Sequence, residues 1–311
     1  MPEYDITLLT MKDFLTAEPG DVLIEDLLKE DTLVTAALEK RGLNVTRKSW
    51  DDPEFKWHNT RHVIVRTPWD YFSRYDEFGP WLDRTSKVTN FINPVKTILW
   101  NIDKHYMLDL DEEGINMPAT VFVEPRPPGS DDDRSLAEIA RETGWDEFIL
   151  KPAISGGAWH TYRVNKDTIA EHEEIFKELI TDKSMLLQEY QKSITSDGEV
   201  SYMVLGGKFT HAILKKAKEG DYRVQAVHGG TIEKYEPTDE EIDFAEEVIS
   251  KCREDIVYAR VDVLRDNENK LSLCELEVFE PELWFRTHPS AVEVFADAVV
   301  KYIEDVIPRT P

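Results

Sequence analysis

YARVDVLRDNENKLSLCELEVFEPELWF, residues 258–285, is the most informative part of the chain. Two β-rich runs flank the turn RDNENK, a pattern that is typical of a β-hairpin. Because side chains alternate between the faces of a strand, Glu275 and Glu277 share one face, and Cys274 is expected on the other. Asp262 stands between two valines on the first strand, and the turn lets it meet Glu275 across the hairpin. The sequence therefore predicts three carboxylates on one sheet face.

Three carboxylates on one face repel one another unless a cation lies among them. Magnesium suits such a set, because it takes one or two carboxylates together with nucleotide phosphates. The alternative is a solvated outer sheet face, and in so acidic a chain this hairpin alone leaves the two interpretations equally open.

The charge of the whole chain restricts its partners. The 311 residues include 37 lysines and arginines and 62 aspartates and glutamates, which gives a formal net charge of −25. This balance disfavours extended contact with nucleic acid or with an anionic membrane surface. A bound phosphate compound would need local cations or a metal to overcome the overall field. The two cysteines are too few for a disulfide framework, and no apolar run approaches the roughly 20 residues that span a bilayer. We expect a cytoplasmic protein with no signal peptide, and the sequence leaves a homodimer open.

The chain begins with alternating strands and helices. Strands are expected at residues 4–9, 43–47 and 62–67, and a helix over 22–40, which indicates a parallel sheet in an α/β layer. No glycine-rich turn follows the first strand, so a nicotinamide-dependent dehydrogenase has no support.

After Pro94 the pattern changes. Residues 95–113 have helical spacing and predict one helix that ends at Gly114. Beyond Asp182 the chain has longer strands joined by tight turns, and Gly206-Gly207 indicates a hairpin. Further elements are expected as strands over 120–124, 147–153 and 221–230, and as helices over 239–252 and 289–306.

Two segments offer a phosphate site. Lys151 ends an apolar strand directly before the glycine loop of residues 155–157, and glycines let backbone N–H groups approach an anion closely. Arg223, which is expected on a strand face with Gln225, offers a planar fork for phosphate oxygens. The alternatives are an ordinary turn and a surface arginine, and Lys104 taken alone would be a solvated helix lysine.

The order of these motifs over residues 94–285 resembles the ATP-grasp superfamily, in particular its glutathione synthetase/ribosomal S6-modification (RimK) type. The matching runs are WNIDK, FILKPAISGG, LLQEYQ, DGEVSYMVLGGKFTHAILKKAKEGDYRVQAVHGG and ARVDVL…CELEVFEPELWF. The runs VRTPWDY and NPVKTILWNIDKHYMLDL look closer still to a branch that includes the cycloserine-forming cyclo-ligase.

The resemblance implies an α/β (α+β) fold of the ATP-grasp type. Residues 1–93 would form a Rossmann-like N-terminal substrate domain. Residues 94–186 would form the central subdomain with the glycine loop, and residues 187–311 the C-terminal subdomain with the metal site. ATP would lie between these two α+β subdomains.

On matching positions the resemblance implies roles for single residues. The phosphates of ATP would lie against two lysines and a flexible loop, namely Lys104, Lys151, Ser155, Gly156 and Gly157. The adenine and the ribose would lie against a hinge and an acidic residue, namely Gln188, Glu189, Tyr190 and Glu199. The catalytic cations facing the transferred phosphoryl group would be Lys215 and Arg223. Two magnesium ions, for which manganese could substitute, would be held by Asp262, Glu275 and Glu277, with Glu275 bridging them.

Two positions depart from the pattern of the family. Glu277 stands where this type usually has asparagine, but another carboxylate is still a hard oxygen ligand, so metal binding survives. Ser201 stands where relatives often have arginine, which puts one phosphate or substrate contact in doubt unless Lys215 compensates.

The resemblance implies an ATP-dependent carboxylate–amine ligase that forms a carbon–nitrogen bond. A small amino-acid-like carboxylate would attack the γ-phosphorus of ATP, giving an acyl phosphate and ADP, and a nitrogen nucleophile would then displace phosphate. Arg66, Trp69 and Asp70 follow a strand at its carboxyl end, where α/β sheets bind ligands, so they are candidate substrate contacts. A buried salt bridge and a core tryptophan are the alternatives for these residues.

Two other functions remain open. A kinase on the same fold would release a stable phosphorylated product and would need no amine. A non-catalytic nucleotide-binding protein would be favoured by loss of the metal carboxylates, yet all three are present.

Overall fold

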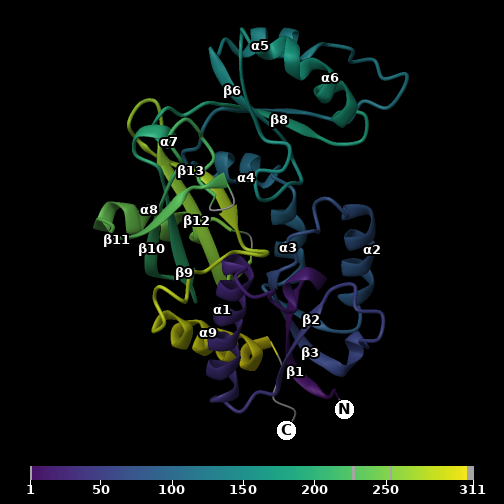
Figure 1. Ribbon diagram of the computed structural model, residues 1–311, viewed down its shortest axis with the longest axis vertical. Helices are drawn as coiled ribbons and strands as arrows, with labels where there is room; N and C mark the ends of the chain where they lie inside the picture. The colour runs from purple at the N-terminus through teal and green to yellow at the C-terminus, as the bar shows by residue number, and fades with distance from the viewer. Residues whose placement is uncertain (1, 226–227, 253, 307–311) are drawn as a thin grey trace.

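The computed structural model describes residues 2–225, 228–252 and 254–306. Three sheets and their helices form the molecule (Figure 1). The N-terminal sheet is parallel, with strand order β2-β1-β3-β4. Its strands are β1 (Tyr4–Thr10), β2 (Val45–Ser49), β3 (Thr60–Thr67) and β4 (Asn90–Ile92), and its helices are α1 (Val22–Glu39) and α2 (Tyr75–Thr85), with short 3-10 turns at Lys12–Phe14 and Trp57–Asn59. The predicted parallel α/β layer is confirmed. Strand β2 begins later than expected, because Leu43 N–H donates to Leu38 O in the turn that ends α1 (3.3 Å).

The helix predicted over residues 95–113 is two helices, α3 (Val95–Ile102) and α4 (Tyr106–Glu112). Asp103 has an extended backbone (φ −98°, ψ 121°), and its carboxylate accepts the N–H of His105 at 3.0 Å. The N–H of Lys104 donates to Ala153 O of the central region at 3.0 Å. The prediction of one continuous helix was therefore wrong, and the break is what brings Lys104 against the glycine loop.

The central sheet is antiparallel, with strand order β5-β8-β6-β7. Its strands are β5 (Thr120–Val123), β6 (Glu147–Pro152), β7 (Tyr162–Asn165) and β8 (Met185–Glu189). Helices α5 (Leu136–Thr143) and α6 (Ile169–Leu179) pack on it around Phe148, Leu150 and Phe176, at the top of Figure 1. The boundary expected between residues 186 and 187 falls inside β8, so the sheet itself extends to Glu189.

The C-terminal sheet is also antiparallel, with order β11-β10-β9-β12-β13. Its strands are β9 (Glu199–Leu205), β10 (Lys208–Lys216), β11 (Thr231–Tyr235), β12 (Tyr258–Arg265) and β13 (Leu271–Glu277), and its helices are α7 (Ser193–Ser196), α8 (Asp239–Ser250) and α9 (Ala291–Val306). Both predicted hairpins are present, β9–β10 through Gly206-Gly207 and β12–β13.

The strand predicted over residues 221–230 is a loop in the part that the structure describes, and Ala226 and Val227 lie outside the described residues. The carboxylate of Asp221 accepts the N–H groups of Tyr222 (2.7 Å) and Arg223 (2.9 Å). This local capping turns the backbone away from a sheet ladder, since an aspartate side chain competes with strand hydrogen bonds.

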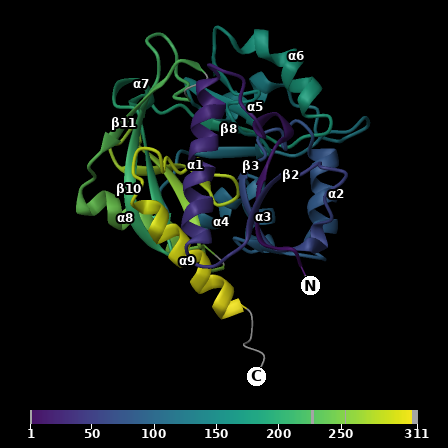
Figure 2. The ribbon, with the colours of Figure 1, turned by 60° about the horizontal axis from the view of Figure 1, so that its bottom comes forward.

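The N-terminal sheet and the C-terminal sheet share one core. Side chains of β1 and β3 pack with those of β9 and α9 in a single cluster. Helices α1 and α9 cross each other in Figure 2, and Arg41 bonds to Glu293 (2.9 Å) and Asp297 (2.6 Å) across this contact. Asn93, which is fully buried, adds hydrogen bonds from the end of β4 to Tyr258 O and Val278 O, both at 2.8 Å. The N-terminal unit is therefore fixed against the sheet that carries the carboxylates. In the described part of the chain, no helix is both long and apolar enough to cross a membrane.

Candidate active site

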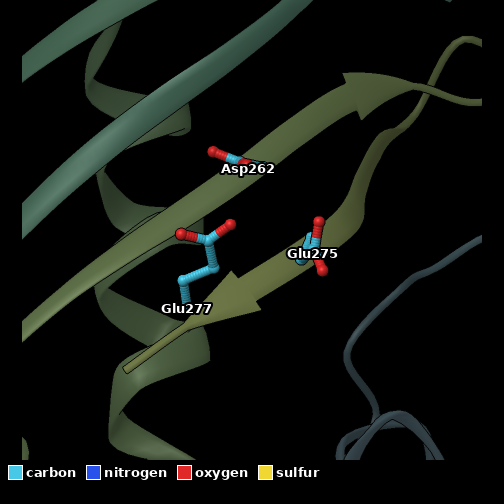
Figure 3. Close-up of side chains that lie close together, drawn as sticks. All are labelled: Asp262, Glu275 and Glu277. Atoms are coloured by element: carbon cyan, nitrogen blue, oxygen red, sulfur yellow. The ribbon is translucent and has the colours of Figure 1, made fainter. Parts of the chain in front are cut away.

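The three carboxylates of the last hairpin come together as predicted. Asp262 of β12 pairs directly with Glu275 of β13, and Glu277 lies two residues further along the same strand. Carboxylate oxygens of Asp262, Glu275 and Glu277 lie within 4.8 Å of one another. Figure 3 shows all three on one side of the strand pair.

Strand β13 lies at the edge of its sheet. Side chains of α3 and α4 form hydrogen bonds with the backbone groups on its outer side. Asn101 donates to Leu276 O (2.7 Å) and accepts from Val278 N–H (2.9 Å). Tyr106 accepts the N–H of Leu276 at 2.8 Å. These buried bonds fix the backbone on both sides of Glu277 and so determine where the carboxylates point.

Three buried cations contact the carboxylates. Lys215 of β10 donates to Asp262 Oδ2 at 3.1 Å and is also paired with Glu199. Arg260, on the same strand face as Asp262, donates to Asp262 at 2.8 Å and bonds to Glu277 as well. Lys215 and Arg260 therefore each bridge two acidic groups.

The third cation, Lys104, links the carboxylates to the glycine loop. Its Nζ lies 3.1 Å from Glu275 Oε1 and donates to the backbone oxygen of Ser155 at 2.8 Å. Lys151, at the end of β6, is buried and donates to Gln188 Oε1 at 3.4 Å. Both lysines proposed for the phosphates therefore lie in the interior beside the glycine loop or the hinge.

The pKa values of the three carboxyls move in opposite directions. Burial alone would raise the pKa of Asp262, but Arg260 and Lys215 hold it well below its usual range. Lys104 and Lys151 likewise outweigh burial and lower the pKa of Glu275. The pKa of Glu277 is raised well above its usual range, because burial outweighs its single contact with Arg260. The cluster has an excess of negative charge that a divalent cation would relieve, and its hard oxygen donors fit magnesium.

The glycine loop lies under an aromatic residue of the N-terminal unit. A Cβ placed on Gly156 would lie 2.9 Å from Phe72 Cδ1, so only glycine fits without displacing that ring. Trp159 of the same loop packs on Phe72 with ring centroids 5.6 Å apart. Gly157 has φ +58° and nothing within 4 Å of the position of a Cβ. The loop is thus anchored on one side and open on the other.

The hinge expected to face adenine joins the central and C-terminal sheets. Gln188 is buried in β8, and Glu189 N–H donates to Ala119 O at 2.9 Å. Tyr190 is buried, its N–H donates to Glu147 O at 3.1 Å, and its carbonyl oxygen accepts from Asn267 of the β12–β13 turn at 3.1 Å.

The expectation that Cys274 points away from the carboxylates was wrong. The register of β12 and β13 shifts between Asp262 and Val263, which leaves Cys274 as the extra residue of a β-bulge. Its thiol bonds to Glu199, and burial and Glu199 raise its pKa well above the usual range. A bulge reverses the alternation on which the prediction depended.

Comparisons with known proteins agree with this geometry. Residues 164–283 match the family model of the RimK-like ATP-grasp domain. The chain contains a RimK-like ATP-grasp domain. Residues 6–93 match the model of the N-terminal domain of the D-cycloserine synthetase DcsG.

The chain is 25% identical over 278 residues to the cycloserine biosynthesis protein DcsG of Streptomyces lavendulae, covering 85% of this chain and 90% of that one. The crystal structure of D-cycloserine synthetase DcsG superposes with a TM-score of 0.83 at 22% identity, over 96% of this chain and 99% of that one. The ATP-grasp ligase PsnB, solved with Mg and ADP, gives 0.62 at 14% identity, over 97% and 99% of the chains. The D-alanine–D-alanine ligase from Bacillus anthracis complexed with ATP also gives 0.62 at 14% identity, over 96% of each chain. At these identities the solved structures establish the shared fold, and the predicted ATP-grasp fold is confirmed.

Four residues predicted to lie at the site have other partners. Arg223 pairs with Asp221 on its own loop (2.8 Å), and no contact with the carboxylates is present among the described residues. Arg66 is 1% exposed and bonds to Asp31 at 3.0 Å and Glu30 at 3.4 Å. Trp69 Nε1 donates to Glu280 O at 3.2 Å. Asp70 accepts hydrogen bonds from Trp50 Nε1 and from Arg74, both at 2.8 Å.

Sequence reasoning missed Arg260. The signal was available, because Arg260 and Asp262 are two residues apart on one strand and must share a face. Ser201, fully buried, donates to Asp262 Oδ1 at 2.5 Å. Arg260, from the strand that pairs with β9, bonds to the same carboxylate and so places a guanidinium beside Ser201.

Proposed function

We propose that this protein is an ATP-dependent ligase that joins a small amino-acid-like carboxylate to a nitrogen nucleophile with formation of a carbon–nitrogen bond. The observation that carries the proposal is the cluster of Asp262, Glu275 and Glu277, with buried cations bonded to each carboxylate. Fold neighbours that are ligases support it, including one solved with Mg and ADP and one with ATP.

In this proposal Asp262, Glu275 and Glu277 hold two magnesium ions, which when bound neutralise charge on the nucleotide phosphates. Lys104 and Lys151 bind the phosphates beneath the glycine loop.

The nucleoside end of ATP lies against the hinge in this proposal. Glu199 is paired with Lys215, but its carboxylate retains lone pairs that can accept hydrogen bonds from the ribose hydroxyls. Adenine lies along the hinge of residues 188–190.

The chemistry proceeds in two displacements. An oxygen of the substrate carboxylate attacks the γ-phosphorus, the bond to the β–γ bridging oxygen breaks, and its electron pair leaves with ADP. The nitrogen nucleophile then attacks the acyl carbon, the bond to the phosphate oxygen breaks, and the nitrogen loses a proton. In this proposal Arg260 and Lys215 neutralise charge on the transferred group, a role that their contacts with Asp262 support.

An acyl phosphate hydrolyses readily, so the site must exclude water while this intermediate exists. The glycine loop, anchored by the contact of Gly156 and Trp159 with Phe72, is positioned to cover the phosphates. Arg223, with its guanidinium partly exposed on a neighbouring loop, remains a second proposed cation that would have to leave Asp221 to reach the phosphates.

The experiment is an ADP-release assay over D- and L-amino acids, each with and without a second amino acid, ammonia or hydroxylamine. Wild-type protein is expected to release ADP with magnesium present and to form an amide-type product. Glu275→Gln is expected to abolish release, because the central carboxylate of the cluster is lost.

The matched control is Glu268→Gln, which alters an exposed glutamate in the turn of the same hairpin and should retain wild-type activity. Circular dichroism shows whether both variants fold. Retained ADP release in a folded Glu275→Gln variant would contradict the metal assignment. A stable phosphorylated product that never reacts with an amine would favour a kinase instead.

A further inference from the structure

The segment after β13 carries a buried carboxylate, Glu280, which is 9% exposed. The N-terminal unit holds its backbone: Trp69 Nε1 donates to Glu280 O at 3.2 Å, and Arg66 Nη1 donates to Pro281 O at 3.4 Å. Arg66 and Trp69, which were predicted to contact substrate, therefore fix the segment that presents Glu280.

Glu280 differs from the other buried acidic residues of the described chain. In each of the others, a carboxylate oxygen lies within 4.0 Å of a lysine or arginine nitrogen. These other buried acidic residues are Glu30, Asp31, Glu199, Glu241 and Asp262. Within the described ranges, Glu280 has no such partner, and its hydrogen bond is to the hydroxyl of Tyr71. Burial raises the pKa of Glu280 to about 7, and Glu275 adds to this effect. Arg260 and Lys104 act on Glu280 only from beyond salt-bridge distance and do not offset its burial, so the carboxylate has room for a directly bonded cation.

The carboxylate of Glu280 lies at the candidate active site. A Cβ on Gly156 would lie 3.8 Å from Glu280 Oε1 and against the ring of Phe72, so this carboxylate lies directly beside the glycine loop. Trp159 stacks obliquely on Phe72 at 5.6 Å and continues the aromatic wall. A carboxylate next to aromatic rings is a favourable environment for an organic ammonium group. Glu280 is not one of the three carboxylates that meet within 4.8 Å.

We propose that Glu280 binds the protonated amino group of the amino-acid substrate, with Tyr71 orienting the carboxylate and Phe72 and Trp159 enclosing the site. This inference rests on the proposed ligase function and specifies its substrate class as an amino acid bearing a free ammonium group. A hydroxy acid of the same shape leaves Glu280 buried without an opposite charge, so discrimination on the order of 100-fold or more is expected.

The test compares amino acids with their 2-hydroxy analogues. The amino acid that gives the fastest ADP release in the assay above, and its 2-hydroxy acid, are titrated calorimetrically into protein loaded with magnesium and a non-hydrolysable ATP analogue. Wild-type protein is expected to bind the amino acid on the order of 100-fold more tightly, and Glu280→Gln to reduce this ratio to near one. Affinity for the magnesium–nucleotide complex should not change.

Glu282→Gln is the matched control, since it removes a carboxylate from the same segment that pairs with Arg286 at 2.8 Å. It should keep the wild-type ratio. Tyr71→Phe should lower the ratio several-fold, and it provides the test if Glu280→Gln does not fold.

The outcomes separate the two proposals. An unchanged ratio in Glu280→Gln, or in Tyr71→Phe where that variant replaces it, overturns the role of Glu280 while the ligase function stands. Equal weakening of nucleotide and substrate binding in Glu280→Gln would make Glu280 a metal ligand and also overturns the inference. Wild-type protein that releases no ADP with any amino acid removes the proposed function and, with it, the inference.

Discussion

The support of β13 by Asn101 provides a quantitative prediction. Asn101 is 7% exposed, and its amide donates to Leu276 O at 2.7 Å and accepts from Val278 N–H at 2.9 Å. Asn101→Ala leaves both backbone groups buried without a partner, at about 1–3 kcal/mol each. The free energy of unfolding should fall by roughly 2–6 kcal/mol. Because the freed backbone flanks Glu277, magnesium affinity should also fall by about 10-fold or more.

Urea unfolding, followed by circular dichroism and tryptophan fluorescence, measures the first effect, and calorimetric titration of magnesium with nucleotide measures the second. Asn90→Ala is the control, because Asn90 is exposed and makes one long side-chain bond to Arg61 O at 3.3 Å. The control should change the unfolding free energy by less than about 0.5 kcal/mol. If Asn101→Ala costs no more than Asn90→Ala, the edge-strand explanation is wrong.

Three further predictions concern the loop, a histidine and a buried lysine. Gly156→Ala places a Cβ 2.9 Å from Phe72 Cδ1 and should lower Tm, and adding Phe72→Leu should restore part of the lost Tm; no rescue would contradict the contact. His105 lies between two carboxylates that outweigh burial and raise its pKa, so its stabilisation is full below about pH 6.5 and is lost as pH rises through the raised value. His105→Gln should therefore lower Tm more at pH 6 than at pH 9, and equal losses would argue against the charge pairing. Lys215→Met leaves Asp262 with one cation fewer and should cost about 3–5 kcal/mol of unfolding free energy along with turnover, as urea unfolding and ADP release would show.

The carboxylate cluster was predictable because a hairpin with period-two alternation leaves little freedom. Once Asp262 and Glu275 are on paired strands, their side chains must meet on one face, and the structure has them in direct register. The same rule failed for Cys274, since the extra residue of a β-bulge reverses the faces and no local residue type announces it.

The break between α3 and α4 was not predictable from spacing, since residues 95–113 keep helical periodicity throughout. It depends on a local bond of Asp103 to His105 N–H and on the tertiary bond of Lys104 N–H to Ala153 O. Pattern rules cannot anticipate a partner that is about fifty residues away.

The partners of Arg66 and Trp69 show a second limit of the sequence. Their position at the carboxyl end of β3 was read correctly, but their contacts come from Asp31 and from residues 280–281, more than 200 residues further along the chain. The same distance in sequence concealed Glu280, which has no lysine or arginine nitrogen within 4.0 Å among the residues that the structure describes, a fact apparent only after folding.

The central claim is a magnesium-dependent nucleotide site, and a melting curve tests it most directly. Wild-type protein is melted with magnesium alone, with a non-hydrolysable ATP analogue alone and with both together. Occupancy at about 100 times Kd should add roughly 2.7 kcal/mol, a rise of several degrees that appears only when magnesium and nucleotide are both present. An unchanged Tm at millimolar analogue with magnesium would contradict the account.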